Sequence, residues 1–299
     1  MNRKKKWIIY GIGLSLVLGG CMGNGVDEKQ AEVKDEYARV QDYKGEGYFL
    51  NNGDENDQIA EAKSGEVERA VTDFFLEEYK TEVVVHNLVG NVDGVTVFVE
   101  STGPLHFYSS AIVPINQKAK EIISDEVRSQ EDVVEEGIRE GLYFKIFEEE
   151  FKKLDHYLEE LASEKEVVGR TVKSLQNTGG SGFMTPYYTI TSFNGDEAIQ
   201  PVYDLYMEDP DTKTENLKSA FNTELFDEEY LTMNVILYMS EEKASPSKSL
   251  LEKVLKDLEG MDSIPNGTYQ IIINDNGIHK ESSEGYKDNS IKAEFIKSK

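Results

Sequence analysis

The feature that most constrains this chain is its N-terminus, residues 1–21, which ends at the only cysteine. The opening MNRKKK carries four cations, and the run Trp7–Leu18 carries no charge. A cationic segment followed by a short apolar run is the layout of a secretory signal. A spanning helix needs about 20 apolar residues, so this run is too short for a permanent anchor. We expect the rest of the chain to fold outside the cytoplasm, without an intramolecular disulfide, because Cys21 has no partner.

The residues Leu18-Gly19-Gly20-Cys21 resemble a bacterial lipobox, in which an aliphatic residue and two small residues precede a cysteine. Small side chains let the backbone enter a peptidase cleft, and the Cys21 sulfur can carry a diacylglyceryl thioether. We therefore expect residues 1–20 to be a lipoprotein signal peptide, and Cys21 to hold the protein on the membrane. Two or more acyl chains give stable anchoring. The alternatives are an ordinary signal peptide beside a stray thiol, or an uncleaved anchor.

The expected mature chain is strongly acidic. Residues 1–20 hold four of the 32 Lys and Arg and none of the 57 Asp and Glu, so the formal charge after cleavage is near −29. This charge argues against binding nucleic acid, and against binding anionic lipid through a basic face. It favours solubility, and the alternative is a preference for cationic partners or metal ions.

Residues 21–56 are expected to form a lipid-anchored acidic tether, because they are polar and rich in Gly, Asn and Asp. The part around residues 43–50 is able to dock as an edge segment. The tether would lift a folded domain clear of the lipid.

The first folded unit, residues 57–165, is predicted to hold a helix, an antiparallel meander and a long helix. Asp93-Gly94 indicates a hairpin turn, because both residues accept positive φ. We expect the long helix to pack on the meander, with Gly137 and Gly141 marking close packing or a break. Hydrophobic spacing predicts helices over 57–80 and 125–164, and strands over 83–89, 95–99 and 105–115.

Residues 166–299 are predicted to form a second, smaller α+β unit, so the fold class is α+β. The boundary between the units is soft, and one continuous domain stays an alternative. The tail from Gly277 is polar and is expected to be loose. The spacing predicts strands over 187–193, 230–240 and 264–275, and helices over 198–207, 216–222 and 247–261.

Two histidines, His86 and His106, fall in neighbouring predicted strands and form a small site if their side chains share a face. The alternative is two separate strand residues. None of the four histidines has the i, i+4 spacing of a zinc helix, and there is no second cysteine. The segment Gly179–Gly182 lacks the lysine of a P-loop and the last glycine of a nucleophile elbow, so we predict a flexible turn.

The acidic clusters match no regular calcium loop. Lys213 stands at the fifth position of the stretch that begins Asp209-Pro210-Asp211, and Ile59 replaces the required glycine after Asp54 and Asn56. The run at residues 148–150 is expected to be a solvated helix face. A pair of hydrolytic carboxylates cannot be selected from 57 acids. Of the pairs Phe107-Tyr108 and Tyr187-Tyr188, which could stack on sugars, one residue each is expected in the core. The sequence therefore supplies no catalytic residue, metal ligand or cofactor site.

Several segments resemble a family of uncharacterised lipoproteins from low-GC Gram-positive bacteria, catalogued as domain of unknown function 1672. The resemblance covers nearly the whole mature chain. It implies a membrane-anchored extracytoplasmic lipoprotein and no established activity, and it gives a role to Cys21 alone. The segments are Asp42–Gly47, VHNLVGNVDGVTVFVES, HFYSSAIVPI, GLYFKIFEEEFKKLD, TGGSGFMTPYY and IPNGTY.

The expected function is a non-enzymatic binding or interaction module that recognises an unidentified envelope protein or ligand. One alternative is an envelope hydrolase that uses carboxylates or an irregular metal site. A transporter-associated substrate-binding lipoprotein ranks third, because such proteins usually show alternating βα units in two lobes, and the first half of this chain is a hairpin meander.

Overall fold

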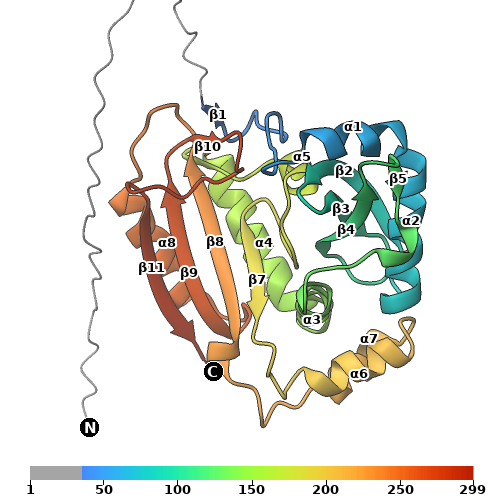
Figure 1. The fold of residues 1–299 in the computed structure, drawn as a ribbon. Coiled ribbons are helices and arrows are strands. Elements are labelled where there is room, and N and C mark those ends of the chain that lie inside the picture. The colour runs from blue at the N-terminus through green and yellow to red at the C-terminus, as the bar shows by residue number, and fades with distance from the viewer. Residues whose placement is uncertain (1–35, 299) are drawn as a thin grey trace, which may run out of the picture. The chain divides into compact units, whose positions relative to one another are not determined.

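The structure, a computed structural model, describes residues 36–298, which belong to one compact unit. The expected signal peptide, Cys21 and residues 22–35 of the expected tether lie outside the described residues. The fold is α+β, as predicted, with an N-terminal meander on one side and a larger sheet on the other (Figure 1). One continuous cluster of buried apolar side chains runs through both sheets.

The meander is a four-stranded antiparallel sheet in the order β2-β3-β4-β5. The predicted hairpin is confirmed, with Asn91 pairing with Gly94. The Asn91 Oδ1 closes the turn by accepting the backbone N–H groups of Asp93 at 2.7 Å and Gly94 at 3.0 Å. The strands are β2, Val83–Asn91; β3, Gly94–Ser101; β4, Tyr108–Asn116; and β5, Glu121–Ile122.

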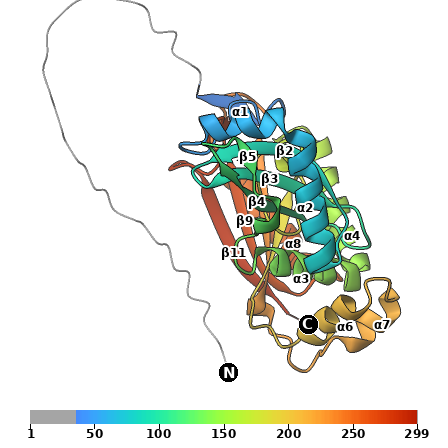
Figure 2. The same ribbon diagram turned by 45° about the vertical axis from the view of Figure 1, so that its right-hand side comes forward.

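Two helices, α1 (Asp54–Ala62) and α2 (Ser64–Tyr79), cover one face of the meander (Figure 2). The sequence predicted one helix over 57–80, but the backbone leaves the helical conformation at Lys63, where φ is −122° and ψ is 24°. The side chains of Val67, Val71 and Phe75 are fully buried on the sheet side. Spacing of three and four residues therefore located the apolar face of α2 but not the break before it.

The predicted long helix over 125–164 is wrong, because the chain forms two helices, α3 (Val133–Ile146) and α4 (Glu148–Ser163). A short 3₁₀ turn, η1, precedes them at Ser124–Glu126. The break falls at Phe147, with φ −112° and ψ 30°, and not at a glycine. The expectation that the whole helix packs on the meander is also wrong, since α3 contacts both β4 and β7 and α4 packs on the larger sheet.

The two glycines of α3 mark close packing. A Cβ at Gly137 would lie 2.8 Å from Cδ2 of Phe107, and one at Gly141 would lie 3.3 Å from the His106 carbonyl oxygen. The segment before β4 therefore approaches the α3 backbone directly. This contact fixes the meander against the helix that also meets the larger sheet.

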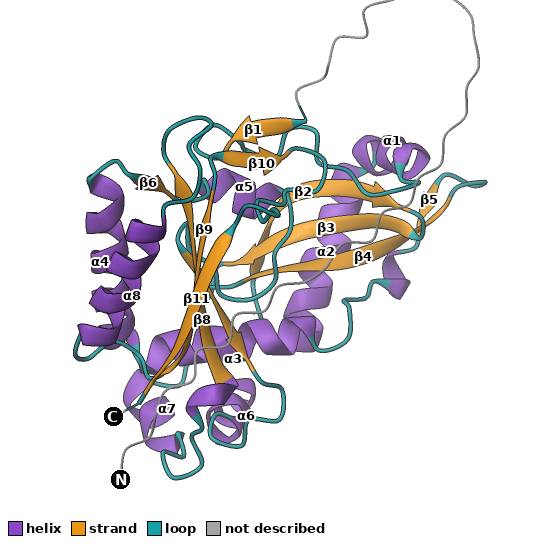
Figure 3. Ribbon diagram, turned by 90° about the vertical axis from the view of Figure 1, so that its left-hand side faces the viewer, coloured by secondary structure: helices purple, strands orange, loops and turns teal. Residues whose placement is uncertain are grey.

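The larger sheet has the order β11-β9-β8-β6, and β7 pairs with β8 beside β6. Only β8 and β9 pair in parallel, and α8 connects them, as a parallel pair requires. The helices α4 and α8 lie side by side on one face of this sheet (Figure 3). The strands are β6, Val167–Val168; β7, Tyr188–Ser192; β8, Leu231–Met239; β9, Gly267–Asn274; and β11, Ile291–Lys297.

The remaining helices agree in position with the predictions for the second half, apart from α5 and the 3₁₀ turn η2, which were not predicted. The Ser247 side chain caps α8 by accepting the Leu250 N–H at 3.2 Å. The elements are α5, Val172–Asn177; α6, Gln200–Glu208; α7, Thr214–Ala220; η2, Glu228–Tyr230; and α8, Lys248–Gly260. No helix within residues 36–298 has the length and apolar character to cross a membrane.

The expected loose tail is folded. Its strand β11 pairs with β9 from Ile291 to Lys297, and the Phe295 ring stacks on Tyr269 with centroids 4.9 Å apart. The preceding strand β10, Gly277–His279, pairs with β1, Tyr37–Arg39. Strand β11 therefore forms the edge of the larger sheet, and β10 belongs to a separate two-stranded sheet with β1.

The described end of the expected tether is also packed. Val40 and Tyr43 are each 1% exposed, and the Tyr43 hydroxyl donates to the Lys280 carbonyl oxygen at 2.7 Å. Docking was expected only around residues 43–50, and the structure extends it to β1. A tether of residues 21–56 is thus too long, because the folded unit begins before Val40.

Replacing Gly137 with Ala should destabilise the protein, although alanine favours helices. The added methyl group would overlap the buried Phe107 ring, and overpacking of this kind costs about 1–3 kcal/mol. The matched control is Gly260→Ala at the end of α8, where a Cβ meets nothing within 4 Å. We expect that control to be neutral or to stabilise by up to about 1 kcal/mol. Urea unfolding measures both, and equal midpoints for the two variants would contradict the close packing.

Candidate functional site

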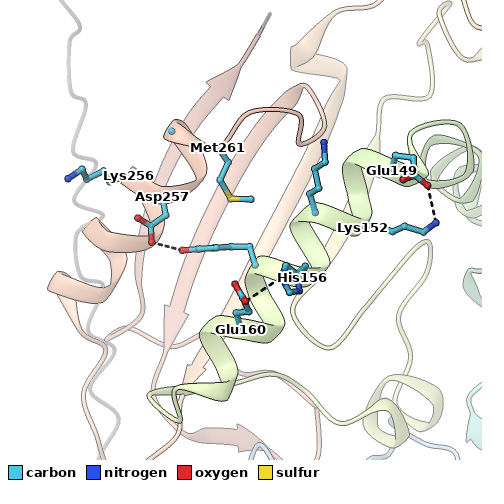
Figure 4. Close-up of a pocket in the computed structure, with 10 residues that line it drawn as sticks. Glu149, Lys152, His156, Glu160, Lys256, Asp257 and Met261 are labelled. Atoms are coloured by element: carbon cyan, nitrogen blue, oxygen red, sulfur yellow. Dashed lines mark hydrogen bonds and ion pairs between the residues drawn. The ribbon is translucent and has the colours of Figure 1, made fainter.

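An open groove lies between α4 and the C-terminal end of α8, with a volume of about 790 Å³ (Figure 4). The helices form its walls because each places its apolar residues toward the sheet and its long polar side chains outward. The lining residues are Glu149, Lys152, Lys153, His156, Tyr157, Glu160, Lys256, Asp257, Gly260 and Met261.

Apolar atoms dominate the groove surface. Tyr157 of α4 reaches α8, where its hydroxyl donates to Asp257 Oδ2 at 3.2 Å. Burial raises the pKa of Tyr157, and the Asp257 carboxylate raises it further, so the phenol stays neutral and keeps this bond. The Met261 side chain and the aliphatic stems of the lysines add apolar surface around the ring.

The charged groups at the rim are only partly paired. Lys152 lies 3.0 Å from Glu148 and from Glu149, and His156 lies 3.3 Å from Glu160. These exposed pairs contribute little to stability. Within residues 36–298, no carboxylate lies within 4.0 Å of the Lys153 or Lys256 ammonium. An apolar surface beside uncompensated cations suits a ligand with an apolar body and an anionic group.

The structure brings the two predicted histidines together through a third residue, Glu100. His86 is the extra residue of a β-bulge in β2, where the pairing shifts between Val85 and Asn87. Its Nε2 lies 2.7 Å from Glu100 Oε2, and the His106 Nδ1 lies 3.5 Å from Glu100 Oε1. Sequence analysis missed Glu100, although an acid in the otherwise apolar strand VTVFVES was a signal for it.

The Gln176 side chain and the Tyr108 ring also border this histidine cluster. Gln176 of α5 donates from Nε2 to Glu100 Oε2 at 2.9 Å. Burial lowers the pKa of His106, and the Glu100 charge partly opposes that change. Burial, with a contribution from Glu100, raises the pKa of Tyr108 to about 12. The cluster can orient an imidazole, but no group of three His, Cys, Asp or Glu residues in the described chain is placed to hold a metal ion.

The predicted turn at residues 179–182 lies against the start of β4. Tyr108 and Gly182 exchange two backbone hydrogen bonds, of 2.9 and 2.8 Å. Gly182 has φ +91°, and a Cβ there would overlap the Glu140 carboxylate. Glu140 accepts the Phe183 N–H at 2.9 Å. Burial raises the pKa of Glu140 to about 8, although hydrogen bonds from the backbone at Phe183 and Ser192 lower it.

The other residues examined in the sequence have structural surroundings. Asp209 Oδ1 accepts the Asp211 N–H at 3.1 Å in an exposed turn after α6. Asn56 is buried and donates to the Asn91 carbonyl oxygen at 2.8 Å. Residues 148–150 form the first turn of α4. The expectation of one core residue in each aromatic pair is wrong for Phe107-Tyr108, because both are buried, and right for Tyr187-Tyr188, where residue 188 is buried and residue 187 is partly exposed.

Replacing Glu140 with Gln should make stability less dependent on pH. The folded state raises the pKa of Glu140 from 4.5 to about 8, so it favours the protonated carboxyl. This contribution is complete below about pH 4.5 and is lost as the pH rises through about 8. At about 1.4 kcal/mol per pKa unit, the variant should exceed wild type by a few kcal/mol at the upper end of this range. Urea unfolding across the range measures the difference.

The control for that experiment is Glu131→Gln, which removes one negative charge from an exposed position. Parallel stability curves for wild type and Glu140→Gln would show that the carboxyl does not titrate in this window.

Comparisons with known proteins agree on one family. A family model described as a protein of unknown function, DUF1672, matches residues 30–299. A crystal structure of a DUF1672 family protein from Staphylococcus aureus subsp. aureus Mu50 has a TM-score of 0.71 and 18% identity, covering 88% of this chain and 99% of that chain. No curated protein matches. The structural likeness confirms the fold, and the family model spans most of the chain, so the chain belongs to the DUF1672 family.

Proposed function

We propose that this protein is a lipid-anchored lipoprotein on the extracytoplasmic face of the cell membrane, and that its folded unit is a non-enzymatic binding module. The observation that carries the binding role is the groove between α4 and α8, with its apolar surface and its two uncompensated lysines. The sequence Leu18-Gly19-Gly20-Cys21, after a cationic and an apolar segment, supports the anchor.

The length of chain after Cys21 limits how far the folded unit extends from the lipid. Residues 22–36 separate Cys21 from β1. A chain spans at most about 3.3–3.6 Å per residue, so β1 would lie within about 50 Å of the acyl chains. The folded unit would therefore stand in the envelope, where a ligand reaches the groove.

The ligand class follows from the groove chemistry. Tyr157 and Met261 offer apolar contact, and Lys153 and Lys256 come from opposite helices. In a chain with 57 acids and 32 bases, ammonium groups without a carboxylate partner are the groups that gain most from an incoming anion. We therefore propose an amphipathic anion with an apolar body as the ligand.

The envelope hydrolase is the second candidate, and the His86–Glu100–His106 contacts favour it. A carboxylate that orients an imidazole is a recurring part of hydrolytic sites. In this cluster, however, both imidazoles pair with Glu100 oxygens, and no hydroxyl group among residues 36–298 is hydrogen-bonded to either imidazole as a nucleophile would be. The groove therefore supports a binding role better than the cluster supports hydrolysis.

The anchor makes a direct prediction for cells. Cys21→Ala should abolish labelling by radioactive palmitate, and should release the protein from the membrane or leave its precursor uncleaved, because no other side chain can take the thioether. Met22→Ala is the matched control, because it alters the neighbouring residue and keeps the sulfur of Cys21. Unchanged labelling and membrane retention in Cys21→Ala would exclude lipidation at this residue.

The groove makes a second prediction, which uses the anionic dye 1-anilinonaphthalene-8-sulfonate as the probe. The folded wild-type protein should bind the dye and raise its emission, and the double variant Lys153→Gln with Lys256→Gln should bind it several-fold more weakly. Exposed charge pairs contribute roughly 0.2–1 kcal/mol each, so the expected loss for two lysines is about twofold to thirtyfold.

The control for the groove is Lys118→Gln with Lys120→Gln, which removes two exposed lysines from the loop between β4 and β5. Equal weakening by both double variants would show that the dye senses net charge alone. A Tyr157→Ser variant removes the ring that lines the groove, and unchanged dye binding by it would place the dye elsewhere.

A further inference from the structure

A further uncompensated cation, Arg170, lies where the first folded residues meet α5 and the turn after β10. Its backbone N–H donates to the Pro186 carbonyl oxygen at 2.9 Å, which fixes the residue directly after β6. Its guanidinium donates from Nε to Ser174 Oγ at 3.4 Å and from Nη2 to Thr178 Oγ1 at 3.1 Å. A third bond runs from Nη2 to Ser283 Oγ. Every partner is a neutral hydroxyl.

No acidic side chain among residues 36–298 lies within 4.0 Å of this guanidinium, although the chain holds 57 acids. Arg170 is only partly exposed, and burial lowers its pKa. A covered charge without a partner is unfavourable. The contrast is Lys287, close by in sequence to Ser283, which has Asp275 at 2.5 Å. The fold therefore supplies a counterion to one cation of this region and none to the other.

The hydroxyl groups around Arg170 are held in place by the backbone. Ser174 Oγ donates to the Thr171 carbonyl oxygen at 3.0 Å, and Thr178 Oγ1 donates to the Ser174 carbonyl oxygen at 2.7 Å. Both hydroxyls therefore present lone pairs to the guanidinium. With Nε and Nη2 occupied in this way, Nη1 is the nitrogen that has no hydrogen-bond partner among the described residues. Nε and Nη2 are therefore fixed, and Nη1 is left without an internal partner.

The segment DYKGEGY, residues 42–48, covers this arrangement. The Thr171 hydroxyl donates to the Tyr43 carbonyl oxygen at 2.6 Å, and Asn177 donates to the Lys44 carbonyl oxygen at 2.9 Å. Gly45 has φ +106°, and a Cβ there would lie 2.9 Å from Cγ2 of Thr178. Only glycine allows so close a crossing at this φ. This contact gives a physical reason for the glycine in a segment that also carries the family resemblance.

Tyr48, at the end of that segment, adds a second donor. The Tyr48 N–H donates to the Gly45 carbonyl oxygen at 3.2 Å, and Gly45 lies against Thr178, which accepts a hydrogen bond from Arg170. Burial raises the pKa of Tyr48, and the Arg170 charge lowers it. The Tyr48 ring packs edge-on against Phe98, with centroids 5.9 Å apart. Its hydroxyl makes no hydrogen bond to a residue within 36–298, as is the case for Nη1 of Arg170. A guanidinium only donates hydrogen bonds, and a phenol hydroxyl can donate one. Together they suit an oxygen-bearing anion.

We propose that Arg170 and Tyr48 form a binding site for a small oxyanion, with inorganic phosphate as its simplest ligand. The site lies near β1, the strand that follows the expected tether. Phosphate can reach it from two sources: as a free anion, or as the headgroup of an anionic phospholipid. The site is separate from the groove between α4 and α8.

The test uses the full mature chain, residues 21–299, with Cys21→Ser to avoid lipidation. Calorimetric titration with inorganic phosphate at constant ionic strength should show saturable binding at millimolar concentration or below. Arg170→Gln should weaken it by about tenfold to a hundredfold, because the charge-assisted hydrogen bonds are lost, and Tyr48→Phe should weaken it less. The matched control is Arg128→Gln, which removes an exposed arginine that pairs with Asp93 at 3.5 Å.

A second arm uses vesicles of phosphatidylglycerol, with phosphatidylcholine vesicles as the comparison. Binding of phosphate that depends on Arg170 supports a free anion as the ligand. Binding to phosphatidylglycerol vesicles alone, lost in Arg170→Gln, supports a headgroup. Equal binding by wild type and Arg170→Gln in both arms, or no binding in either, overturns the proposal. If Arg170→Gln does not fold by circular dichroism, Arg170→Lys and Tyr48→Phe replace it, and unchanged affinity in both overturns the proposal equally.

Discussion

The close approach of α3 to the segment before β4 is the contact on which the arrangement of the two sheets depends. Gly137 and Gly141 leave room for the Phe107 ring and the His106 backbone, so one side of the helix touches the meander. The same helix contacts β7 of the larger sheet. Because protein interiors are close-packed, the core has no free volume for a methyl group at Gly137. One helix thereby joins two sheets into a single apolar core.

This contact also explains the chemistry found near it. Because α3 fixes residues 105–108, it also holds His106 beside β3, where the His106 Nδ1 lies 3.5 Å from Glu100 Oε1. The next turn of α3 carries Glu140, whose carboxylate accepts the Phe183 N–H and so holds the end of the 179–182 turn. A carboxyl buried in this way, with a raised pKa, stabilises the fold most when it is protonated. The turn at residues 179–182, which matches no catalytic motif, thus has a packing role.

Much of the fold was predictable from periodicity, and the failures share a physical cause. The hairpin at Asp93-Gly94, the meander and α8 followed from turn chemistry and spacing. No sequence signal marked the break at Phe147, because the apolar residues keep helical spacing across it. The alternation of Ile291, Ala293 and Phe295 was a strand signal inside a polar tail, and the polar residues around it concealed the strand.

The candidate sites were less predictable than the elements. The expectation of neighbouring strands for His86 and His106 is wrong, because His86 of β2 and His106 before β4 lie on either side of β3, whose Glu100 joins them. The bulge at His86 shifts the alternation that would have pointed to Glu100. Nothing in the sequence marked Arg170, because its hydroxyl partners lie 4, 8 and 113 positions away. A site assembled from α5 and the turn after β10 depends on tertiary packing alone.

In this acidic chain, the two proposed sites both hold cations that lack a carboxylate partner. Lys152, Lys253 and Lys287 each have a carboxylate within 4.0 Å, whereas Lys153 and Lys256 in the groove and Arg170 beside α5 do not. The strong negative charge of the chain weakens any general attraction to an anionic membrane. An anion that binds this protein must therefore be held by specific, short-range donors, and the α4–α8 groove and the Arg170 site are two places where the described fold offers them.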